Sequence, residues 1–187
     1  MIILALPFIL ILSAVPALAQ LPPPAYARPS QIVFIPQVRF LDTRTGTATC
    51  EAESAPGAPI AIGPFHDAEE RDFMIADCWS ANEDGVITIP PTAIGLVLNI
   101  TAVNPTGKGY LLAYDALAQR PTTSTLNFTP GQNRNSLTIV ALGQYVGQAI
   151  GVPFWPDLAI FTKVSGGGTV DVIVDVLGYL VPAQEAP

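Results

Sequence analysis

The sequence is poor in the residues from which catalytic and metal sites are built. Among 187 residues it has one histidine, His66, and two cysteines. A single histidine excludes histidine-rich metal sites and proton relays between histidines. No serine lies in a Gly-x-Ser-x-Gly elbow, so a serine nucleophile with His66 as its base is not indicated. The chain is therefore not expected to be an enzyme; a hydrolase whose carboxylates converge from distant positions is a third alternative.

Positive charge is scarce as well. Eight basic residues stand against fifteen acidic ones, which gives a net charge of -7. The basic residues are scattered, whereas a nucleic-acid backbone requires clustered lysine and arginine, so nucleic acid is excluded as a partner. No glycine-rich loop precedes a helical pattern, and Gly166 to Gly168 predict a hairpin turn between two strands instead. No cofactor is expected.

Long apolar runs are confined to the start of the chain. Residues 1–19 are almost wholly apolar and end in Ala17-Leu18-Ala19, which predicts a signal peptide cleaved near Ala19 and a secreted, periplasmic or cell-surface protein. An uncleaved anchor is the alternative, because about 20 apolar residues can span a bilayer. No later segment has this character, so membrane insertion of the mature chain is not expected. Residues 20–31 are proline-rich and predict an extended tail.

The two cysteines, Cys50 and Cys78, have no Cys-x-x-Cys partner of the kind that structural zinc sites use. Zinc shared by Cys50, His66 and Cys78 is the less favoured interpretation, because exported proteins mature in oxidising compartments. The sequence predicts a disulfide between them, and loop entropy for a loop of this length gives about 3 to 4 kcal/mol of stabilisation. No bound metal is expected.

Short apolar runs separated by turn residues are what the sequence does have. Fifteen glycines and nineteen prolines, without collagen-like periodicity, separate these runs. This pattern predicts an all-β fold, a single antiparallel β-sandwich of immunoglobulin-like or jelly-roll-like type, over residues 32–180. Residues 181–187 are expected to be a C-terminal tail.

Two stretches carry the strongest strand signals. Residues 96–103 alternate between two faces and are rich in β-branched side chains. Turn residues at 104–109, followed by a new apolar run at 110–114, predict a hairpin. Near the C-terminus four valines share one face of a strand and predict a core stripe packed against residues 96–102. These are Val170, Val172, Val174 and Val176.

Two segments interrupt the strand pattern and are expected to be long excursions from the sandwich. Residues 50–84 hold nine of the fifteen acidic residues, without the Asp-x-Asp-x-Asp-Gly spacing that wraps calcium. A solvated acidic surface is therefore favoured over a calcium site. Residues 143–157 form a loop with three aromatic residues, Tyr145, Phe154 and Trp155.

A compact charged motif occupies residues 39–46, RFLDTRTG. We expect Asp42 to organise a turn while Arg39 and Arg44 neutralise it, with Asp175 joining this structural cluster at a strand end. A catalytic role is less favoured, because no second acid or base flanks the group.

Four phrases, in this order along the chain, resemble a β-sandwich accessory module of secreted and surface proteins of bacteria. They are RFLDTR (39–44), VLNITAVNPTGKGYLLAY (97–114), RPTTSTLNFTPGQ (120–132) and VIVDVLGYL (172–180). In that family they run approximately as RxLDTR, LNVTxxNPTxxGYLTVYP, RPxxSNLNFxxGQ and DVxGYY. The resemblance covers about residues 34–180 and implies a structural or adhesive module with no catalytic residues to transfer. The acidic and aromatic segments depart from the family, where shorter connections stand.

The leading functional hypothesis is an exported, non-catalytic module for protein–protein assembly or adhesion at the cell surface or outside the cell. Its partner is expected to be an envelope or extracellular protein, with self-assembly as a further option. The alternative is a carbohydrate-binding module that stacks sugars on exposed rings. The candidate rings are Trp79, Tyr145, Phe154 and Trp155. Exposed rings beside polar groups favour a polysaccharide ligand, and buried rings favour simple packing.

Overall fold

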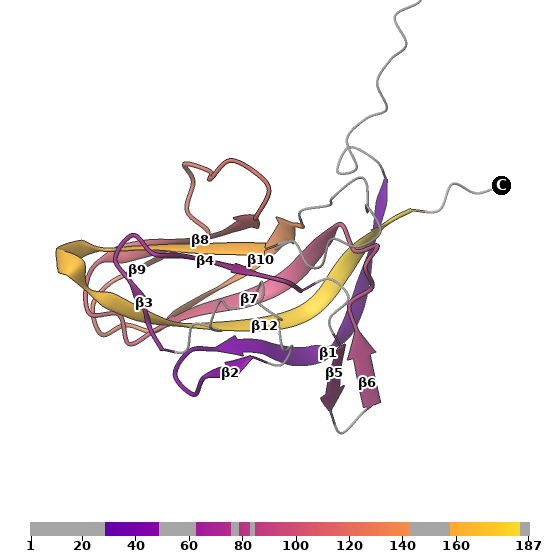
Figure 1. The fold of residues 1–187 in the computed structure, drawn as a ribbon, viewed down its shortest axis with the longest axis horizontal. Coiled ribbons are helices and arrows are strands. Elements are labelled where there is room, and N and C mark those ends of the chain that lie inside the picture. Colours follow the sequence, from indigo (N-terminus) through magenta and orange to yellow (C-terminus); the bar gives the residue numbers. More distant parts are fainter. Residues whose placement is uncertain (1–28, 49–62, 76–78, 83–84, 143–157, 184–187) are drawn as a thin grey trace, which may run out of the picture.

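The computed structural model describes residues 29–48, 63–75, 79–82, 85–142 and 158–183. Strands dominate these residues, together with one short 3₁₀ turn, η2 (Ser165–Gly167). Two antiparallel sheets pack against each other (Figure 1). The prediction of an all-β antiparallel sandwich is confirmed.

The larger sheet has the strand order β10-β7-β12-β1-β2, and all of its pairings are antiparallel. Its strands are β1 (Ser30–Asp42), β2 (Thr47–Ala48), β7 (Gly95–Val103), β10 (Arg134–Ala141) and β12 (Thr169–Pro182). The short strand β3 (Phe65–His66) also pairs with the start of β12. The long strands β7 and β12 lie in the interior of this order and therefore carry much of the core.

The smaller sheet has the order β4-β11-β8-β9. Its strands are β4 (Glu70–Phe73), β8 (Gly109–Asp115), β9 (Leu126–Phe128) and β11 (Leu158–Val164). A separate two-stranded ladder is formed by β5 (Trp79–Asn82) and β6 (Gly85–Thr88).

In the part of the chain that the structure describes, no helix has the length and apolar character needed to cross a membrane.

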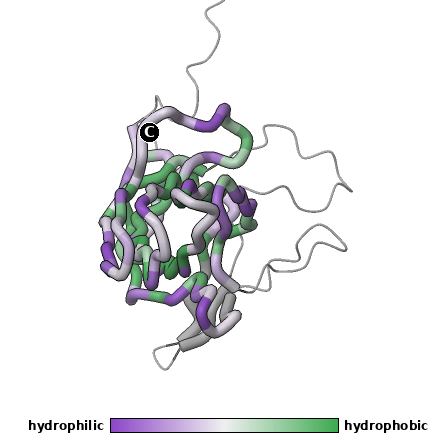
Figure 2. Tube along the Cα trace, turned by 90° about the vertical axis from the view of Figure 1, so that its left-hand side faces the viewer, coloured by the Kyte–Doolittle hydropathy of each residue, from purple (hydrophilic) through white to green (hydrophobic). Residues whose placement is uncertain are grey.

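The hydrophobic core lies between the two sheets, and hydrophobic segments gather in the middle of the sandwich when it is viewed from one end (Figure 2). Side chains directly opposite each other in an antiparallel pair point to the same face. The four valines of β12 and the alternate residues of β7 are at most 1% exposed and belong to one core cluster. The predicted core stripe is therefore confirmed. Its members are Leu96, Leu98, Ile100, Ala102, Val170, Val172, Val174 and Val176.

The connections between the strands differ from the sequence prediction. β7 pairs with β10 and β12, whereas β8 pairs with β9 and β11, so residues 104–108 cross from one sheet to the other. Gly166 to Gly168 cross in the same way between β11 and β12. Both predicted hairpins are wrong. Turn residues require only that the chain reverse its direction, and the same residue types reverse it within a sheet or between two sheets.

The two crossing connections pack on each other at one end of the sandwich (left in Figure 1). The backbone N–H of Thr106 donates to the carbonyl of Thr169 at 2.9 Å, and the N–H of Thr169 donates to Thr106 Oγ1 at 2.7 Å. The N–H of Ser165 donates to the Lys108 carbonyl at 2.7 Å. Gly107 is buried here, and a Cβ at this position would overlap the Ser165 carbonyl oxygen. This end is therefore closed by backbone contact that requires glycine.

The segment predicted as an acidic excursion lies partly in the sandwich. β3 pairs with β12, and β4 pairs with β11 as an edge strand of the smaller sheet. Phe65, Phe73 and Ile75 are buried in the main core. For residues 63–75 the excursion prediction is therefore wrong. The strands are short, and in β4 the charged Arg71 lies on the same face as Phe73 with its side chain only 10% exposed, which hides the alternation of apolar and polar residues.

Candidate functional site on the outer face of the larger sheet

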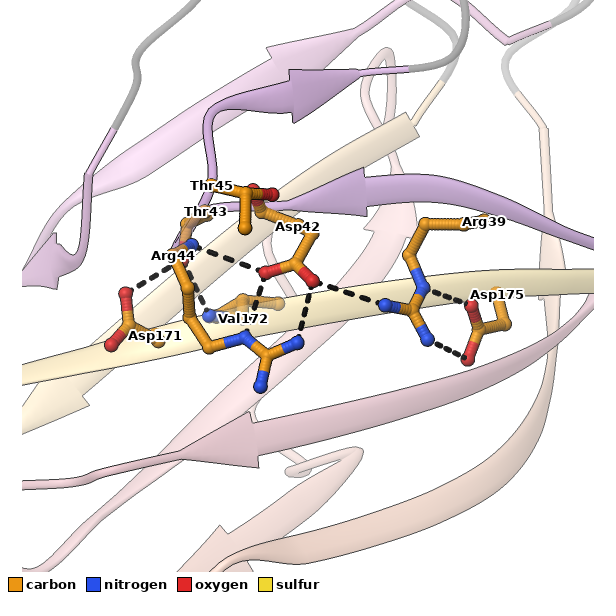
Figure 3. A network of polar contacts seen from close by, with 8 residues as sticks. All are labelled: Arg39, Asp42, Thr43, Arg44, Thr45, Asp171, Val172 and Asp175. Carbon is orange, nitrogen blue, oxygen red and sulfur yellow. Dashed lines mark hydrogen bonds and ion pairs between the residues drawn. The ribbon is translucent and has the colours of Figure 1, made fainter.

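The charged motif near residue 40 forms an ion network on the outer face of the larger sheet (Figure 3). Arg39 and Asp42 belong to β1, and Arg44 lies in the turn that follows. Asp175 belongs to β12 and is the cross-strand partner of Arg39. The structure thus brings together the four residues that the sequence analysis grouped.

Each guanidinium in this network binds a buried carboxylate. Arg39 Nε donates to Asp175 Oδ1 at 2.5 Å, and its Nη1 donates to Asp42 Oδ2 at 3.0 Å. Arg44 donates to both oxygens of Asp42, from Nε at 2.9 Å and from Nη2 at 2.6 Å. The backbone N–H of Arg44 adds a bond of 3.2 Å to Asp42. Both aspartates are 4% exposed, whereas the arginine side chains are 43% and 41% exposed.

The network is electrostatically complete. The hydrogen bonds from Arg44, and then the charges of Arg44 and Arg39, lower the pKa of Asp42 against the opposing effect of burial. The bond to Asp175 raises the pKa of Arg39. The two guanidinium groups face the two buried carboxylates, and no buried side-chain nitrogen or oxygen among the described residues lacks a partner. These bonds tie the end of β1 and the turn that follows it to β12.

Thr43 extends the network along β12. Its hydroxyl donates to Asp171 Oδ1 at 3.0 Å and accepts the backbone N–H of Val172 at 2.9 Å. Its own N–H donates to the Val172 carbonyl at 3.1 Å. The turn after β1 is therefore fixed to β12 on both sides of Asp42.

Replacing Asp42 with asparagine is expected to remove an acid-sensitive contribution to stability. Because the pKa of Asp42 is lowered in the folded state, its contribution is fully present above about pH 4 and is lost as the pH falls through the lowered value. At neutral pH the Asp42→Asn variant should lose about 1.5 to 3 kcal/mol in free energy of unfolding, because one carboxylate oxygen is replaced by an NH2 donor that cannot accept the arginine N–H groups, and the other becomes a neutral acceptor. Urea unfolding from pH 2 to 7 should show the two proteins converging in acid. A deficit that does not depend on pH would contradict this account.

A group of exposed apolar side chains lies on the same face. The larger sheet aligns Ile139, Val97, Gly178 and Phe34 as successive cross-strand partners over β10, β7, β12 and β1. Phe34 is 74% exposed and Ile139 58% exposed. Gly178 has no side chain to cover the Phe34 ring. Neighbouring positions on this face add Leu137, 66% exposed, and Ile32, 45% exposed. We call Ile32, Phe34, Leu137 and Ile139 the outer apolar surface.

In strand β10 the orientation of the side chains is the reverse of the usual one, in which large apolar side chains point to the core and polar ones to solvent. Ser136, Thr138 and Val140 lie opposite the core residues of β7, so this face points inward. The larger aliphatic residues, Leu137 and Ile139, therefore point to solvent. Turning half-buried Ser136 and Thr138 inward while exposing two large apolar side chains is unfavourable in an isolated domain. This surface was not predicted from the sequence, although the alternation of polar and apolar residues at 136–140 is visible there.

A second polar cluster lies on the smaller sheet and joins the loop after β8 to that sheet. The Tyr114 hydroxyl donates to Glu70 at 2.5 Å, and Arg120 lies 3.4 Å from the same carboxylate. The Arg120 guanidinium also stacks over the Phe161 ring at 4.1 Å. Burial, and then the bond to Glu70, raise the pKa of Tyr114. Its groups bind one another, so this cluster also has a structural role.

The other predicted site residues are not placed by the structure. Tyr145, Phe154 and Trp155 lie outside the described residues, and so do Cys50 and Cys78 with their predicted disulfide. Trp79 belongs to β5, but its side chain is not described. The described residues contain no group of three or more histidine, cysteine, aspartate or glutamate side chains arranged to hold a metal ion.

In comparisons with known proteins, no family model, no curated protein and no solved structure matches the chain.

Proposed function

We propose that this chain is an exported, non-catalytic β-sandwich module that mediates protein–protein assembly or adhesion at the cell surface or in the extracellular space. The observation that carries the proposal is the outer apolar surface. Four of the six large hydrophobic side chains that are exposed in the described residues lie together on one face of one sheet. The two others, Tyr110 and Leu117, lie in the smaller sheet and in the loop after β8. Exposed large apolar side chains gathered on one face of a sheet are typical of interaction sites.

The surroundings of this surface fit a protein partner. On β1 and β12 the row that contains Arg39 and Asp175 lies beside the row that contains Phe34. A protein interface typically combines an apolar centre with a charged, solvated rim, and the half-exposed arginines supply such a rim. The rigid Phe34 ring belongs to the residue types that anchor interfaces at low entropic cost. The apolar leader and the resemblance of four phrases to a secreted accessory module support placing this function outside the cytoplasm.

Replacing Phe34 with glutamate is expected to lower the recovery of the protein partner about tenfold, because it puts a charge in place of the most exposed ring of the outer apolar surface. The chain would be tagged, cross-linked in its native envelope or secreted fraction, and purified. Leu117→Glu is the matched control, since Leu117 is an exposed apolar residue distant from this face. Both variants should unfold at nearly the temperature of the unmodified chain, because both residues are exposed.

Equal recovery of the partner by the Phe34→Glu variant and the unmodified chain would contradict the proposed function. Glycan binding by the purified chain, with no protein partner recovered, would replace it with the carbohydrate-binding alternative.

A further inference from the structure

The outer apolar surface reaches an unusually open sheet edge. Within the described residues, β10 pairs on one side only, with β7. Natural sheets protect their edges with short strands or with charged side chains. The other edge strands of the two packed sheets follow this rule: β2 and β9 have two and three residues, and β4 has four, three of them charged. β10 has eight residues, and from Asn135 to Ala141 it has no charge.

We propose that β10 is a pairing edge, and that its partner is β10 of a second copy of this chain. The two strands would run antiparallel about a two-fold axis and join the two larger sheets into one continuous sheet. This inference rests on the proposed assembly function. It specifies the partner that binds at the β10 edge of the chain.

The sequence of β10 is complementary to itself in one register. With Thr138 opposite Thr138 of the second copy, Leu137 lies opposite Ile139 of the second copy, and the reverse pair follows by symmetry. All four aliphatic side chains then share the outer face, because directly opposed residues point to the same side. On the inner face the two Thr138 hydroxyls meet, a favourable cross-strand pair. Pairing thus covers the residues that β10 exposes and satisfies its free backbone groups.

Charge also favours a second copy at this edge. Two chains of net charge -7 repel each other, so they approach best where acidic residues are absent. Neither β7 nor β10 contains an acidic residue, and Arg134 is their only charge. In the register centred on Thr138 the two Arg134 residues lie eight positions apart, roughly 27 Å at about 3.4 Å per residue. This separation exceeds the screening length of about 8 Å at physiological ionic strength.

The dimer should be concentration-dependent. One eight-residue edge buries less area than the roughly 1,600 Å² of a standard stable interface, so dissociation in the micromolar range is expected. Sedimentation velocity on the purified chain, from low micromolar to near-millimolar concentration, should show a monomer–dimer equilibrium. Hydrogen exchange should show added protection of β10 amides at high concentration, and unchanged protection in the edge strand β4.

A charge-swap experiment tests the register. The Leu137→Lys, Ile139→Lys variant places lysines opposite lysines and should weaken the dimer about a hundredfold, since like charges across an interface cost several kcal/mol. The Leu137→Glu, Ile139→Glu variant should weaken it similarly. An equimolar mixture should form a heterodimer, because each lysine then faces a glutamate. Leu117→Lys is the control, and all of these positions are exposed, so the fold should be retained.

The outcomes separate this inference from the proposed function. A chain that stays monomeric at every concentration overturns self-pairing, and so does a dimer that persists in the lysine variant. The chain could instead stay monomeric and recover a protein partner that the Leu137→Lys, Ile139→Lys variant does not recover. That result would show that the β10 edge binds a strand of another protein. Phe34 lies three strands from β10, about 14 Å away, so Phe34→Glu tests the assembly function and should leave the dimer intact.

Discussion

Replacing Arg39 with methionine is expected to lower the free energy of unfolding by about 3 kcal/mol. Arg39 is the residue that binds Asp175, through contacts of 2.5 and 3.4 Å, and it also binds Asp42. Methionine keeps much of the apolar stem but leaves the 4% exposed carboxylate of Asp175 without its cation. Breaking a buried pair in this way costs about 3 to 5 kcal/mol, and the lower end applies because the Arg39 side chain is itself 43% exposed.

Arg44→Met is the matched control for this prediction. Arg44 is exposed to the same degree, but Asp42 keeps both its bond from Arg39 and the backbone N–H of residue 44 when the side chain is removed. The Arg44 variant should therefore lose clearly less stability than the Arg39 variant in urea unfolding at neutral pH. Equal losses in the two variants would show that Asp175 does not depend on Arg39.

The strands with the longest regular patterns could be predicted from the sequence. β7, β11 and β12 have alternating or continuous apolar residues rich in valine and isoleucine, and such runs are favourable only as buried strands. The short strands β3 and β4 could not be predicted in the same way. Their burial depends on single residues such as Phe65 and Phe73, and the charged residues between them resemble a solvated loop.

Which strands pair with each other could not be predicted from residues that are neighbours in the sequence. The residues between β7 and β8 have turn chemistry, and this chemistry is satisfied equally by a hairpin and by a crossing between sheets. Packing of the core distinguishes the two, because each strand pairs where its apolar face can contact residues that are distant in the sequence. The buried face of β10 could not be predicted from the sequence either. Alternation shows that the strand has two different faces, but only the register with β7 shows that Leu137 and Ile139 point outward.

The candidate site was predictable where its residues are neighbours in the sequence. Arg39, Asp42 and Arg44 lie within six positions, so their charges had to interact at the end of β1. The outer apolar surface has no such signal, since Phe34 and Ile139 are more than 100 positions apart and adjoin the same face only through β7 and β12.

The closed end of the sandwich provides the second large effect. Gly107→Ala is expected to lower the free energy of unfolding by about 3 kcal/mol, because the added methyl group overlaps the Ser165 carbonyl oxygen. The Val164 Cγ1 atom at 3.1 Å and the Ser165 Oγ atom at 3.2 Å leave no alternative space. The obstacle is backbone held by the Ser165 to Lys108 hydrogen bond, so relief requires the two connections to separate.

Gly131→Ala separates this steric effect from the conformational freedom of glycine. Gly131 lies in the β9–β10 connection with φ of 70° and no atom within 4 Å of an added Cβ, so alanine meets backbone strain there but no clash. That variant should lose about 1 kcal/mol. Gly107 has no positive φ, so its whole cost comes from the contact between the two connections. If thermal and urea unfolding showed Gly107→Ala to be nearly neutral, the β7–β8 connection would be an open turn.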